Sequence, residues 1–423
     1  MGESRKNNWH LALVAAVFGL VASTSGARAS TVTTAYQFDG ATGMAPRNGN
    51  LLFSGGAIFG STYGGGANDQ GAIITVPLTA DGTGTLVYSF TGTQGAHPNG
   101  SLVADAGGNL YGTTQGGGAA NVGTIFKLIR PAAAGGAWGF SLLHEFAGSP
   151  DGAMPIVGLT FGPDGALYGT AKFGGTGTCV APGVMNGCGT VFRITTGGAF
   201  RVIHQFADAF VSGRYPSTNV VVDPAGNVIG TTSTGATEAD GGGNLFRIAP
   251  DGTFLVVSTF SVRGPIVNPI GTIVRDSAGS IYGMVTFSGT FPNPPTGAAV
   301  FKIAAITHKT SVLTTLGRQA STSGVTLSRS GALYYTTTGG SVTNFDAAAI
   351  AVMQGPGTVY ALVPGSAPVA IASLDYANLS PIGSVIADSA GNLWGQSSAG
   401  GIVCDAPSNG TQSGCGTIYK LTP

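Results

Sequence analysis

The apolar positions of this chain recur in short runs separated by turns and glycine-rich loops. One stretch shows the order well: apolar runs cover Gly158–Phe161, Ala166–Thr170, Thr190–Ile194 and Phe200–Phe206. Short runs of this kind, bounded by Gly, Pro and Asp, are typical of β-strands. We name the four runs A, B, C and D in chain order. Clean polar alternation is missing from the inner runs, which predicts strands covered on both faces.

The same four-run unit repeats along the chain. Run B joins an apolar or aromatic residue to Gly or Thr, as in Leu110-Tyr111-Gly112-Thr113, and run C reads Gly-Thr-aliphatic-aromatic-basic, as in Gly123–Leu128. A period of 50-odd residues built from strands and turns indicates a propeller or a solenoid. Seven units of four strands predict an all-β fold, a seven-bladed β-propeller with four antiparallel strands per blade. Successive B runs lie 52 to 61 residues apart, centred on residues 59, 111, 168, 229, 282, 334 and 394.

The two ends of the repeat array complement each other. The last unit stops after its C run, at Leu421, and an additional D-like run, Thr31–Phe38, precedes the first A run. We expect Thr31–Phe38 to form the outer strand of the seventh blade. Such pairing would close the ring and remove an open sheet edge.

The N-terminus has the three parts of a secretory signal peptide. Arg5 and Lys6 form a basic segment, Leu11–Ala22 is apolar, and Ala27-Arg28-Ala29 is a small-x-small cleavage site. An uncleaved anchor helix is the alternative, but the apolar run is shorter than the ~20 residues of a membrane span. We therefore predict that residues 1–29 are removed and that residues 30–423 form one propeller domain in the periplasm or outside the cell. We see no C-terminal anchor in the sequence.

Four cysteines fit an exported protein. An even number of cysteines in such a chain predicts disulfides, and four allow three pairings. The local pairing, Cys179 with Cys188 and Cys404 with Cys415, joins groups already close along the chain. A zinc site is the rival interpretation, but the short Cys-x-x-Cys knuckles or neighbouring His ligands that it needs are absent from the sequence.

Composition narrows the function classes. The 423 residues include 18 basic and 18 acidic residues, so no charge excess points to nucleic acid or to an anionic membrane. Charged residues make up only 9% of the chain, against ~25% in an average domain. Hydrophobic residues, at 43%, suffice for a large core, which argues against disorder.

The repeat resembles a known family. Units such as Leu110–Thr114 followed by Gly123–Leu128 are similar to the Gloeo/Verruco, or GloVer, repeat of exported bacterial proteins over about residues 35–423. The resemblance implies export and, from the choice-of-anchor name, variable surface-sorting signals at the C-terminus. It implies no catalytic residues.

Charged residues recur in pairs. The A–B turn begins with Asp in four of the five units where the fourth position of run C is Lys or Arg; in the third unit the acid is displaced by two places, to Asp164, and the first and sixth units lack both charges. Runs A and C lie two strands apart, about 10 Å, so we predict one structural pair in each of these blades. A ring of calcium sites is the alternative, although one carboxylate per turn falls short of the 6–8 oxygen ligands of calcium. The predicted pairs are Asp105 with Lys127, Asp164 with Arg193, Asp223 with Arg247, Asp276 with Lys302 and Asp388 with Lys420.

The B–C and D–A loops are the longest connections, and function usually lies on long loops over a rigid scaffold. Proline occupies matching points of six D–A loops, where we expect it to stiffen the backbone. Asp151 could act as a carboxylate acid or base with Asp346 or Asp375 if the ring brings them together. His144 and His204 fall at equivalent D positions and are interpreted as partly buried edge residues rather than metal ligands. The candidate binding residues on this rim are Tyr63, His97, Asp151, Lys172, Arg214, Tyr215, Phe287 and Phe291.

Motifs of hydrolases and nucleotide-binding proteins are absent. The sequence has no Gly-x-Ser-x-Gly elbow, no phosphate loop and no His-Glu-x-x-His. We expect an exported propeller that acts as a binding or scaffold module at the cell envelope, without catalysis, metal or cofactor. The expected partner is an extracellular protein or a glycan, and the expected state is a monomer. Two alternatives stay open: a glycan-active hydrolase or lyase that uses loop carboxylates, and a lactonase-like metalloenzyme with an axial cation.

Overall fold

The structure is a computed structural model of an all-β ring. Within the described residues it contains no helix, and no helix long and apolar enough to cross a membrane is found there. The leader predicted for residues 1–29 lies outside the described part. The structure describes residues 30–47, 49–79, 82–179, 186–207, 212–235, 241–261, 267–287, 297–316, 324–339, 355–375, 380–402, 404 and 414–422.

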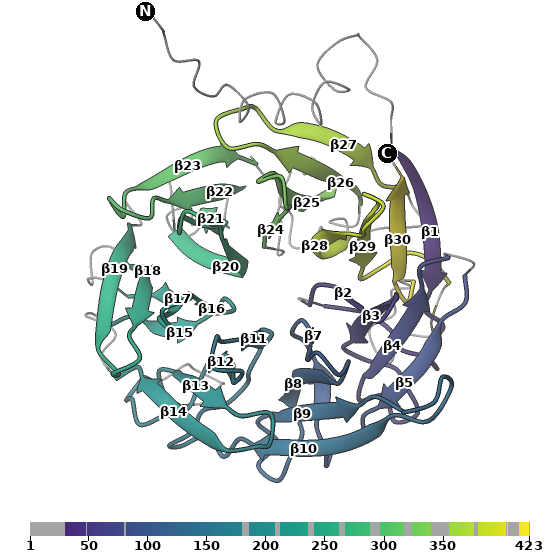
Figure 1. Ribbon diagram of the computed structural model, residues 1–423, viewed down its shortest axis with the longest axis horizontal. Coiled ribbons are helices and arrows are strands. Elements are labelled where there is room, and N and C mark those ends of the chain that lie inside the picture. Colours follow the sequence, from purple (N-terminus) through teal and green to yellow (C-terminus); the bar gives the residue numbers. More distant parts are fainter. Residues whose placement is uncertain are drawn as a thin grey trace, which may run out of the picture.

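Seven antiparallel sheets stand around a central axis (Figure 1), which confirms the predicted seven-bladed propeller. Within each blade the strands follow one another from the axis outwards, in the order A, B, C and D. In blades 2 and 4 a short additional strand, β6 or β15, pairs with strand B beside strand A. The strands of blades 1 to 3 are β2 (Leu52–Ser54), β3 (Ala57–Thr62), β4 (Ala72–Pro77), β5 (Thr85–Ser89), β6 (Ala96–Pro98), β7 (Val103–Ala104), β8 (Leu110–Gly116), β9 (Thr124–Ile129), β10 (Gly139–Glu145), β11 (Thr160–Phe161), β12 (Leu167–Ala171), β13 (Thr190–Ile194) and β14 (Phe200–Gln205).

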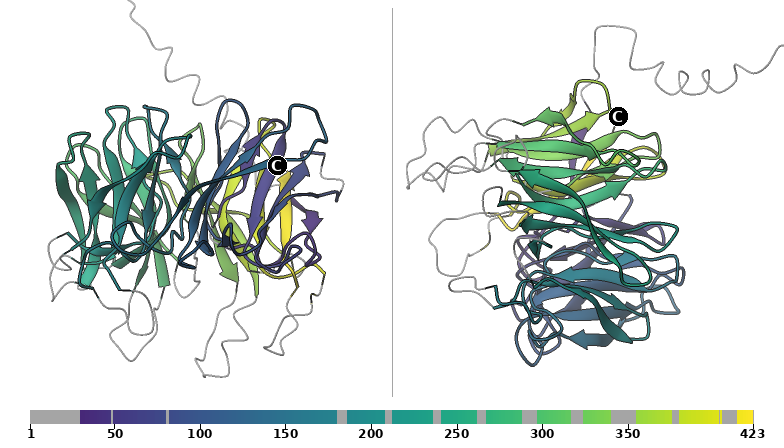
Figure 2. Two further views of the ribbon diagram at one scale, coloured as in Figure 1. Left: turned by 90° about the horizontal axis from the view of Figure 1, so that it is seen from below. Right: turned by 90° about the vertical axis from the view of Figure 1, so that its left-hand side faces the viewer.

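Blades 4 to 7 repeat this arrangement, and Figure 2 shows the blades edge-on, standing side by side like staves. Their strands are β15 (Arg214–Pro216), β16 (Val221–Val222), β17 (Val228–Thr234), β18 (Gly241–Ile248), β19 (Phe254–Ser261), β20 (Val267–Arg275), β21 (Ile281–Phe287), β22 (Gly297–Ile303), β23 (Thr310–Thr315), β24 (Thr326–Leu327), β25 (Leu333–Gly339), β26 (Gly355–Leu362), β27 (Val369–Ser373), β28 (Pro381–Ala387), β29 (Leu393–Ser397), β30 (Thr417–Thr422) and β1 (Thr31–Gln37).

The N-terminal strand closes the ring, as predicted. Strand β1 pairs antiparallel with β30, from Thr31 opposite Thr422 to Gln37 opposite Thr417, and forms the outer edge of blade 7. Ala35, Tyr36 and Phe38 are buried there among side chains of blades 7 and 1. The two ends of the array are therefore held together by one sheet.

The core is divided among the seven seams between adjacent blades. Strands B and C are buried along nearly their whole length, as in β12, where every residue is buried. Each of seven apolar clusters draws on two neighbouring blades; Phe59 of blade 1 and Phe126 of blade 2 share one such cluster. Because neither face of these strands meets water, their sequence lacks polar alternation.

The prolines of the D–A loops pack against the preceding blade. Gly71, with φ +88°, precedes strand C of blade 1, and a Cβ there would lie 2.6 Å from Pro98 Cδ of blade 2. Only glycine leaves room for this approach. The structure thus adds a packing role to the stiffening expected for these prolines. The same contact joins Gly123 to Pro155, Gly189 to Pro216, Gly357 to Pro381 and Gly416 to Pro46.

Candidate functional site

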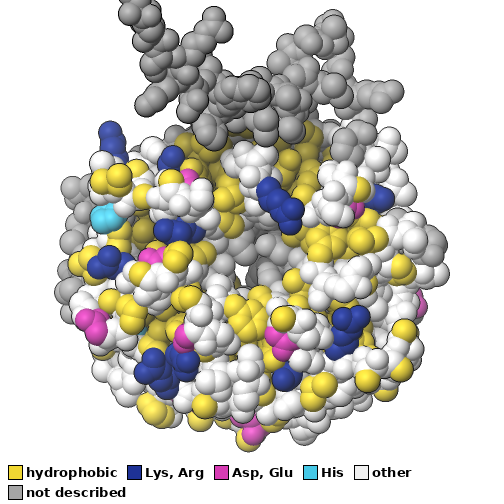
Figure 3. Space-filling model, in the orientation of Figure 1, with side chains coloured by type: hydrophobic (Ala, Val, Ile, Leu, Met, Phe, Trp, Pro, Cys, Tyr) yellow, Lys and Arg dark blue, Asp and Glu magenta, His cyan; other side chains and the backbone are white. Residues whose placement is uncertain are grey.

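The two faces of the ring differ in their connections. The B–C and D–A loops lie on one face, which we call the long-loop rim, while the A–B turns and C–D links lie on the other, the short-turn rim. Figure 3 looks onto the short-turn rim and shows a hollow at the centre of the ring, with Lys and Arg side chains scattered around it.

Each of six described D–A loops carries a left-handed residue directly before its proline. The N–H of His97 donates to the Gln70 carbonyl of the preceding blade at 2.8 Å, and the N–H of Tyr215 donates to the Cys188 carbonyl at 2.8 Å. A left-handed non-glycine residue costs about 1–2 kcal/mol, which these hydrogen bonds offset. The backbone therefore holds these side chains in fixed places on the long-loop rim. The six residues are Ala45, His97, Met154, Tyr215, Asn268 and Ser380, with φ between 44° and 59°.

Two of the predicted rim residues stack on each other at the seam between blades 1 and 2. The Tyr63 ring lies parallel to the His97 ring, with centroids 4.5 Å apart, and the Arg47 guanidinium lies 3.7 Å from the Tyr63 centroid. His97 Nδ1 is 2.9 Å from the Tyr63 carbonyl oxygen. We call these three residues the Arg47 stack. It fixes an exposed guanidinium, and the sequence pattern gave no sign of Arg47.

Three further predicted residues meet at the seam between blades 3 and 4. Tyr215 contacts Phe173 edge-to-face at 5.2 Å, the Arg214 guanidinium lies 5.3 Å from the Tyr215 centroid, and the Lys172 ammonium lies 5.5 Å from the Phe173 centroid. Arg214 Nε also donates to Thr234 Oγ1 at 3.0 Å. Burial lowers the pKa of Lys172. We call Lys172, Phe173, Arg214 and Tyr215 the Lys172 cluster.

Several carboxylates near this rim are already engaged. Asp151 lies 2.9 Å from His144 Nε2 and accepts a hydrogen bond from the Ala147 N–H. Asp39 and Asp69 likewise accept backbone N–H groups within their own loops, and Glu145 accepts one from the B–C loop of its blade. By contrast, no carboxylate of the described residues lies within ion-pair distance of Arg47, Lys172 or Arg214. The cations of this rim are thus available to an anion.

Some predicted residues cannot be placed. Asp346 and Phe291, and the side chain of Phe287, lie outside the described part of the chain. Asp151 pairs with His144 on the outer strand of its own blade. Burial lowers the pKa of His144, although Asp151 acts in the opposite direction.

The cysteines form the two local disulfides. Cys179 is bonded to Cys188 with Cα atoms 5.0 Å apart, and Cys404 to Cys415 with Cα atoms 5.4 Å apart. Both bridges lie in B–C loops of the long-loop rim. The carbonyls of Cys188 and Cys415 accept the hydrogen bonds of Tyr215 and Ala45 in the next blade. The disulfides fit a non-cytoplasmic protein and stiffen two seams.

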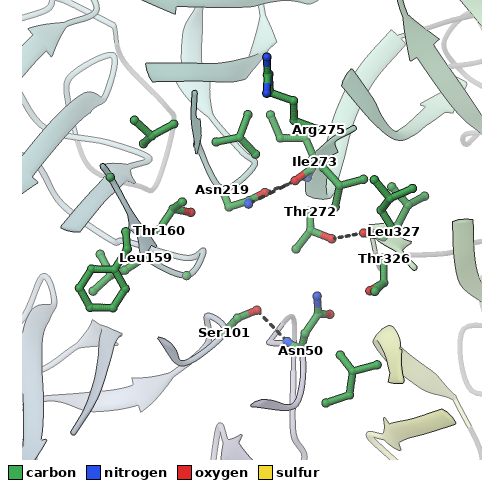
Figure 4. Close-up of a pocket in the computed structure, with 18 of the residues that line it drawn as sticks. Asn50, Ser101, Leu159, Thr160, Asn219, Thr272, Ile273, Arg275, Thr326 and Leu327 are labelled. Atoms are coloured by element: carbon green, nitrogen blue, oxygen red, sulfur yellow. Dashed lines mark hydrogen bonds between the residues drawn. The ribbon is translucent and has the colours of Figure 1, made fainter. Parts of the chain in front are cut away.

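A cavity of about 930 Å³ occupies the axis of the ring (Figure 4). Its lining is mostly apolar, with Asp223 and Arg275 as charged members. Polar residues at the starts of several A strands form a ring in which hydrogen bonds link successive blades: the Asn50 N–H donates to Ser101 Oγ at 2.8 Å, and Thr272 Oγ1 donates to the Val325 carbonyl at 3.1 Å. Asn219 accepts the Ile273 N–H at 2.8 Å. The sequence analysis did not predict this ring. Its sequence signal is a polar residue directly before the buried apolar residue of run A.

The predicted charge pairs take two forms on the short-turn rim. Arg193 Nη2 lies 2.7 Å from Asp164 Oδ2, a direct ion pair. In blades 2, 5 and 7 an aromatic ring lies between the charges: Lys127 lies over the Tyr111 ring at 5.3 Å, and Tyr111 Oη donates to Asp105 at 2.9 Å. The other two aromatic-bridged sets are Asp276, Tyr282 and Lys302, and Asp388, Trp394 and Lys420.

Blade 4 departs from both forms. Asp223 accepts hydrogen bonds from Asn227, while Arg247 Nε is buried without a partner. In the bridged sets, burial works to raise the pKa of Asp105, yet hydrogen bonds from Asn109 and Tyr111 hold it below its usual value. The turn carboxylates are thus committed to their own blades. Among the described residues, no three His, Cys, Asp or Glu side chains are grouped to hold a metal ion.

Comparisons with known proteins agree with the repeat. Residues 16–179 match a family described as the Gloeobacter/Verrucomicrobia repeat, which confirms the resemblance drawn from the motifs. No curated protein matches the chain by sequence.

Solved structures resemble the chain at low sequence identity. A "putative 6-phosphogluconolactonase" from Bacteroides uniformis is 14% identical with a TM-score of 0.52, over 82% of this chain and 88% of that one. TolB from Acinetobacter baumannii is 12% identical with a TM-score of 0.41, over 84% of this chain and 66% of that one. A luciferin-regenerating enzyme is 10% identical with a TM-score of 0.43, over 93% and 95%. The likeness to the structure from Bacteroides uniformis concerns the fold alone.

Proposed function

We propose that this chain, with its Gloeobacter/Verrucomicrobia repeats, is an exported propeller that binds an anionic partner at the cell envelope through its long-loop rim. One observation carries the proposal. Arg47, Lys172 and Arg214 are positioned by aromatic contacts at blade seams and lack a carboxylate partner among the described residues. Nearby carboxylates are engaged by their own loops.

This arrangement suits recognition better than proton transfer. An acid–base site needs carboxylates that converge on a substrate with shifted pKa values. Asp151, the predicted candidate, is engaged by His144 and by the Ala147 backbone. The hydrolase and metalloenzyme alternatives therefore gain no support from the described residues.

The guanidinium groups are well prepared for an anionic partner. Arg presents a planar fork of donors that matches a carboxylate or a phosphate. Stacking of Arg47 on Tyr63 and the bond from Arg214 Nε to Thr234 Oγ1 restrict both side chains before binding. Such preorganisation lowers the entropy lost on association.

Charge reversal on the rim tests the proposal. The chain carrying Arg47→Glu and Arg214→Glu should lose about tenfold or more of its retention on isolated bacterial outer-membrane and peptidoglycan fractions. The matched control carries Arg201→Glu and Arg329→Glu, which make the same charge change on exposed residues of the short-turn rim. Equal losses in the two variants, or no retention of the wild type, would contradict a binding role for the long-loop rim.

A further inference from the structure

A second cavity lies on the short-turn rim, the face opposite the long-loop rim, at the seam between blades 1 and 2. Its volume is about 1100 Å³, slightly above the roughly 300–1,000 Å³ of small-molecule pockets. Strands β2 to β5 of blade 1 form one wall. The A–B turn of blade 2 and its C–D link, residues 130–138, form the other. We call this cavity the blade 1–2 groove.

The groove lies where blade 1 lacks the charge pair of its neighbours. In blade 2 the equivalent seam is occupied by Asp105, Tyr111 and Lys127, which contact one another. Blade 1 has Ser54, Phe59 and Thr75 at these positions. The smaller side chains at Ser54 and Thr75 leave more space at this seam. Equivalent seams further along the ring hold cavities of about 600 Å³ (blades 3 and 4) and 310 Å³ (blades 4 and 5).

A long C–D link in blade 2 contributes a cationic and an aromatic side chain to the groove. The link between β9 and β10 has nine residues, 130–138, whereas the link between β13 and β14 has five, 195–199. Its Trp138 contacts Phe59 edge-to-face, with centroids 5.6 Å apart. Its Arg130 reaches across the seam to the blade 1 turn, since a Cβ at Gly55 would lie 3.3 Å from Arg130 Nη2.

The polar groups of the groove suit a ligand that carries a negatively charged group and hydroxyl groups. None of the lining residues is acidic, and Arg130 has no ion-pair partner among the described residues. Thr75 Oγ1 is buried without a hydrogen-bond partner, which costs about 1–3 kcal/mol. This hydroxyl lines the same cavity as a cation, Arg130, and an aromatic side chain, Trp138.

We infer that the blade 1–2 groove binds a carboxylated saccharide. Arg130 would bind the carboxylate through its planar donor fork. Trp138, which packs edge-to-face on the buried Phe59, would cover the apolar face of a pyranose ring, and Thr75 Oγ1 would bind a sugar hydroxyl. This site is separate from the cations of the long-loop rim, so the inference does not depend on the function proposed for that rim.

Calorimetry with defined oligosaccharides tests the inference on the full chain. Trigalacturonate should bind, and maltotriose, a neutral trisaccharide, should bind at least about tenfold more weakly. Arg130→Gln should weaken trigalacturonate binding about tenfold or more, because one charge-assisted hydrogen-bond pair is lost. The matched control is Arg201→Gln, an exposed cation at the seam between blades 3 and 4, which should leave the affinity unchanged.

A second variant separates binding from folding. Thr75→Val removes the unpartnered hydroxyl but keeps the shape, so it should raise the melting temperature while it weakens trigalacturonate binding roughly threefold to tenfold. A hydroxyl with only a structural role would leave the affinity unchanged. No binding of trigalacturonate, equal binding of both trisaccharides, or unchanged affinity in Arg130→Gln would overturn the inference. Loss of envelope retention in the long-loop variants does not bear on it.

Discussion

The seams between blades 1 and 2 and between blades 3 and 4 occupy equivalent places on the short-turn rim, yet their cavities measure about 1100 and 600 Å³. At the smaller one, Arg193 and Asp164 form an ion pair and Tyr168 Oη donates to the same carboxylate. At the larger one Thr75 and Phe59 replace Arg193 and Tyr168, and the A–B turn of blade 1 contains no acidic residue. A repeat protein can thus create a site by omitting a recurring contact, while its backbone frame stays the same.

The frame around blade 1 depends on ring closure, and the largest expected effect comes from breaking it. Deletion of Thr31–Phe38 removes β1 and takes Ala35, Tyr36 and Phe38 out of the seam between blades 7 and 1. We expect the free energy of unfolding to fall by at least about 5 kcal/mol, and the melting temperature measured by calorimetry to fall by about 10 °C or more. The control, Thr31→Ala with Thr33→Ala, changes exposed residues of the same strand. Similar melting of the deletion and the control would show that closure is dispensable.

Two glycines of blade 1 separate backbone conformation from packing at the seam. Gly71 and Gly56 have φ of +88° and +82°, but a Cβ at Gly71 would collide with Pro98 Cδ, whereas one at Gly56 would meet nothing within 4 Å. Gly71→Ala should lower the free energy of unfolding by about 2–4 kcal/mol and Gly56→Ala by about 1 kcal/mol, as measured by denaturant unfolding. Equal losses would mean that the Gly–Pro contact does not join the blades.

The outer edges of the same two seams should differ in their response to pH. Tyr88 stacks on Phe140 at one seam, and His204 stacks on Phe254 at 4.0 Å at the other. Burial lowers the pKa of His204 to about 4, against ~6.5 in an unfolded chain. Below pH 6.5 the unfolded chain binds a proton that the folded chain does not, so stability falls between pH 6.5 and 4 and levels off below that.

His204 accounts for a decrease of at most ~3 kcal/mol in the free energy of unfolding over this pH range. The variant His204→Tyr, which copies Tyr88, should remove this part of the pH dependence in urea unfolding at pH 7, 5.5 and 4. Parallel stability profiles for the wild type and the variant would show that His204 is not the titrating group.

The charge pair itself should contribute little to stability. Asp164→Asn removes the charge opposite Arg193 but keeps a hydrogen-bond acceptor. Because both side chains are partly exposed, we expect a loss of ~0–1 kcal/mol, visible as a small drop in melting temperature at low salt that vanishes in 1 M NaCl. If Asp164→Asn lowered the free energy of unfolding by several kcal/mol, the absence of the pair from blade 1 would be costly. That result would contradict the view that blade 1 can omit the pair while its backbone stays the same.

The repeat made much of the fold predictable from sequence. The period placed the seven blades, and the additional run Thr31–Phe38 predicted closure, because each strand type has a fixed neighbour in a propeller. The pair Asp164 and Arg193 could also be inferred, since A and C runs lie a fixed distance apart in one blade.

The sites were harder to predict because they depend on contacts between blades. Arg130 and Trp138 belong to a C–D link that is longer than its counterparts in the other blades, so the period of the repeat does not indicate where these two side chains lie. Arg47 follows the proline of its D–A loop, and its stacking on Tyr63 depends on how the two connections of blade 1 approach. The left-handed conformation of His97 and Tyr215 has no residue signature, because it is imposed by hydrogen bonds to the preceding blade.

The most direct test installs the missing contact in blade 1. The variant with Ser54→Asp, Phe59→Tyr and Thr75→Lys reproduces the residues of blade 2 at the blade 1–2 groove. Calorimetric titration with trigalacturonate should show an affinity at least about tenfold below that of the wild type, because the groove is filled and Thr75 Oγ1 is gone. An affinity equal to that of the wild type would contradict the claim that omission of the pair created the site.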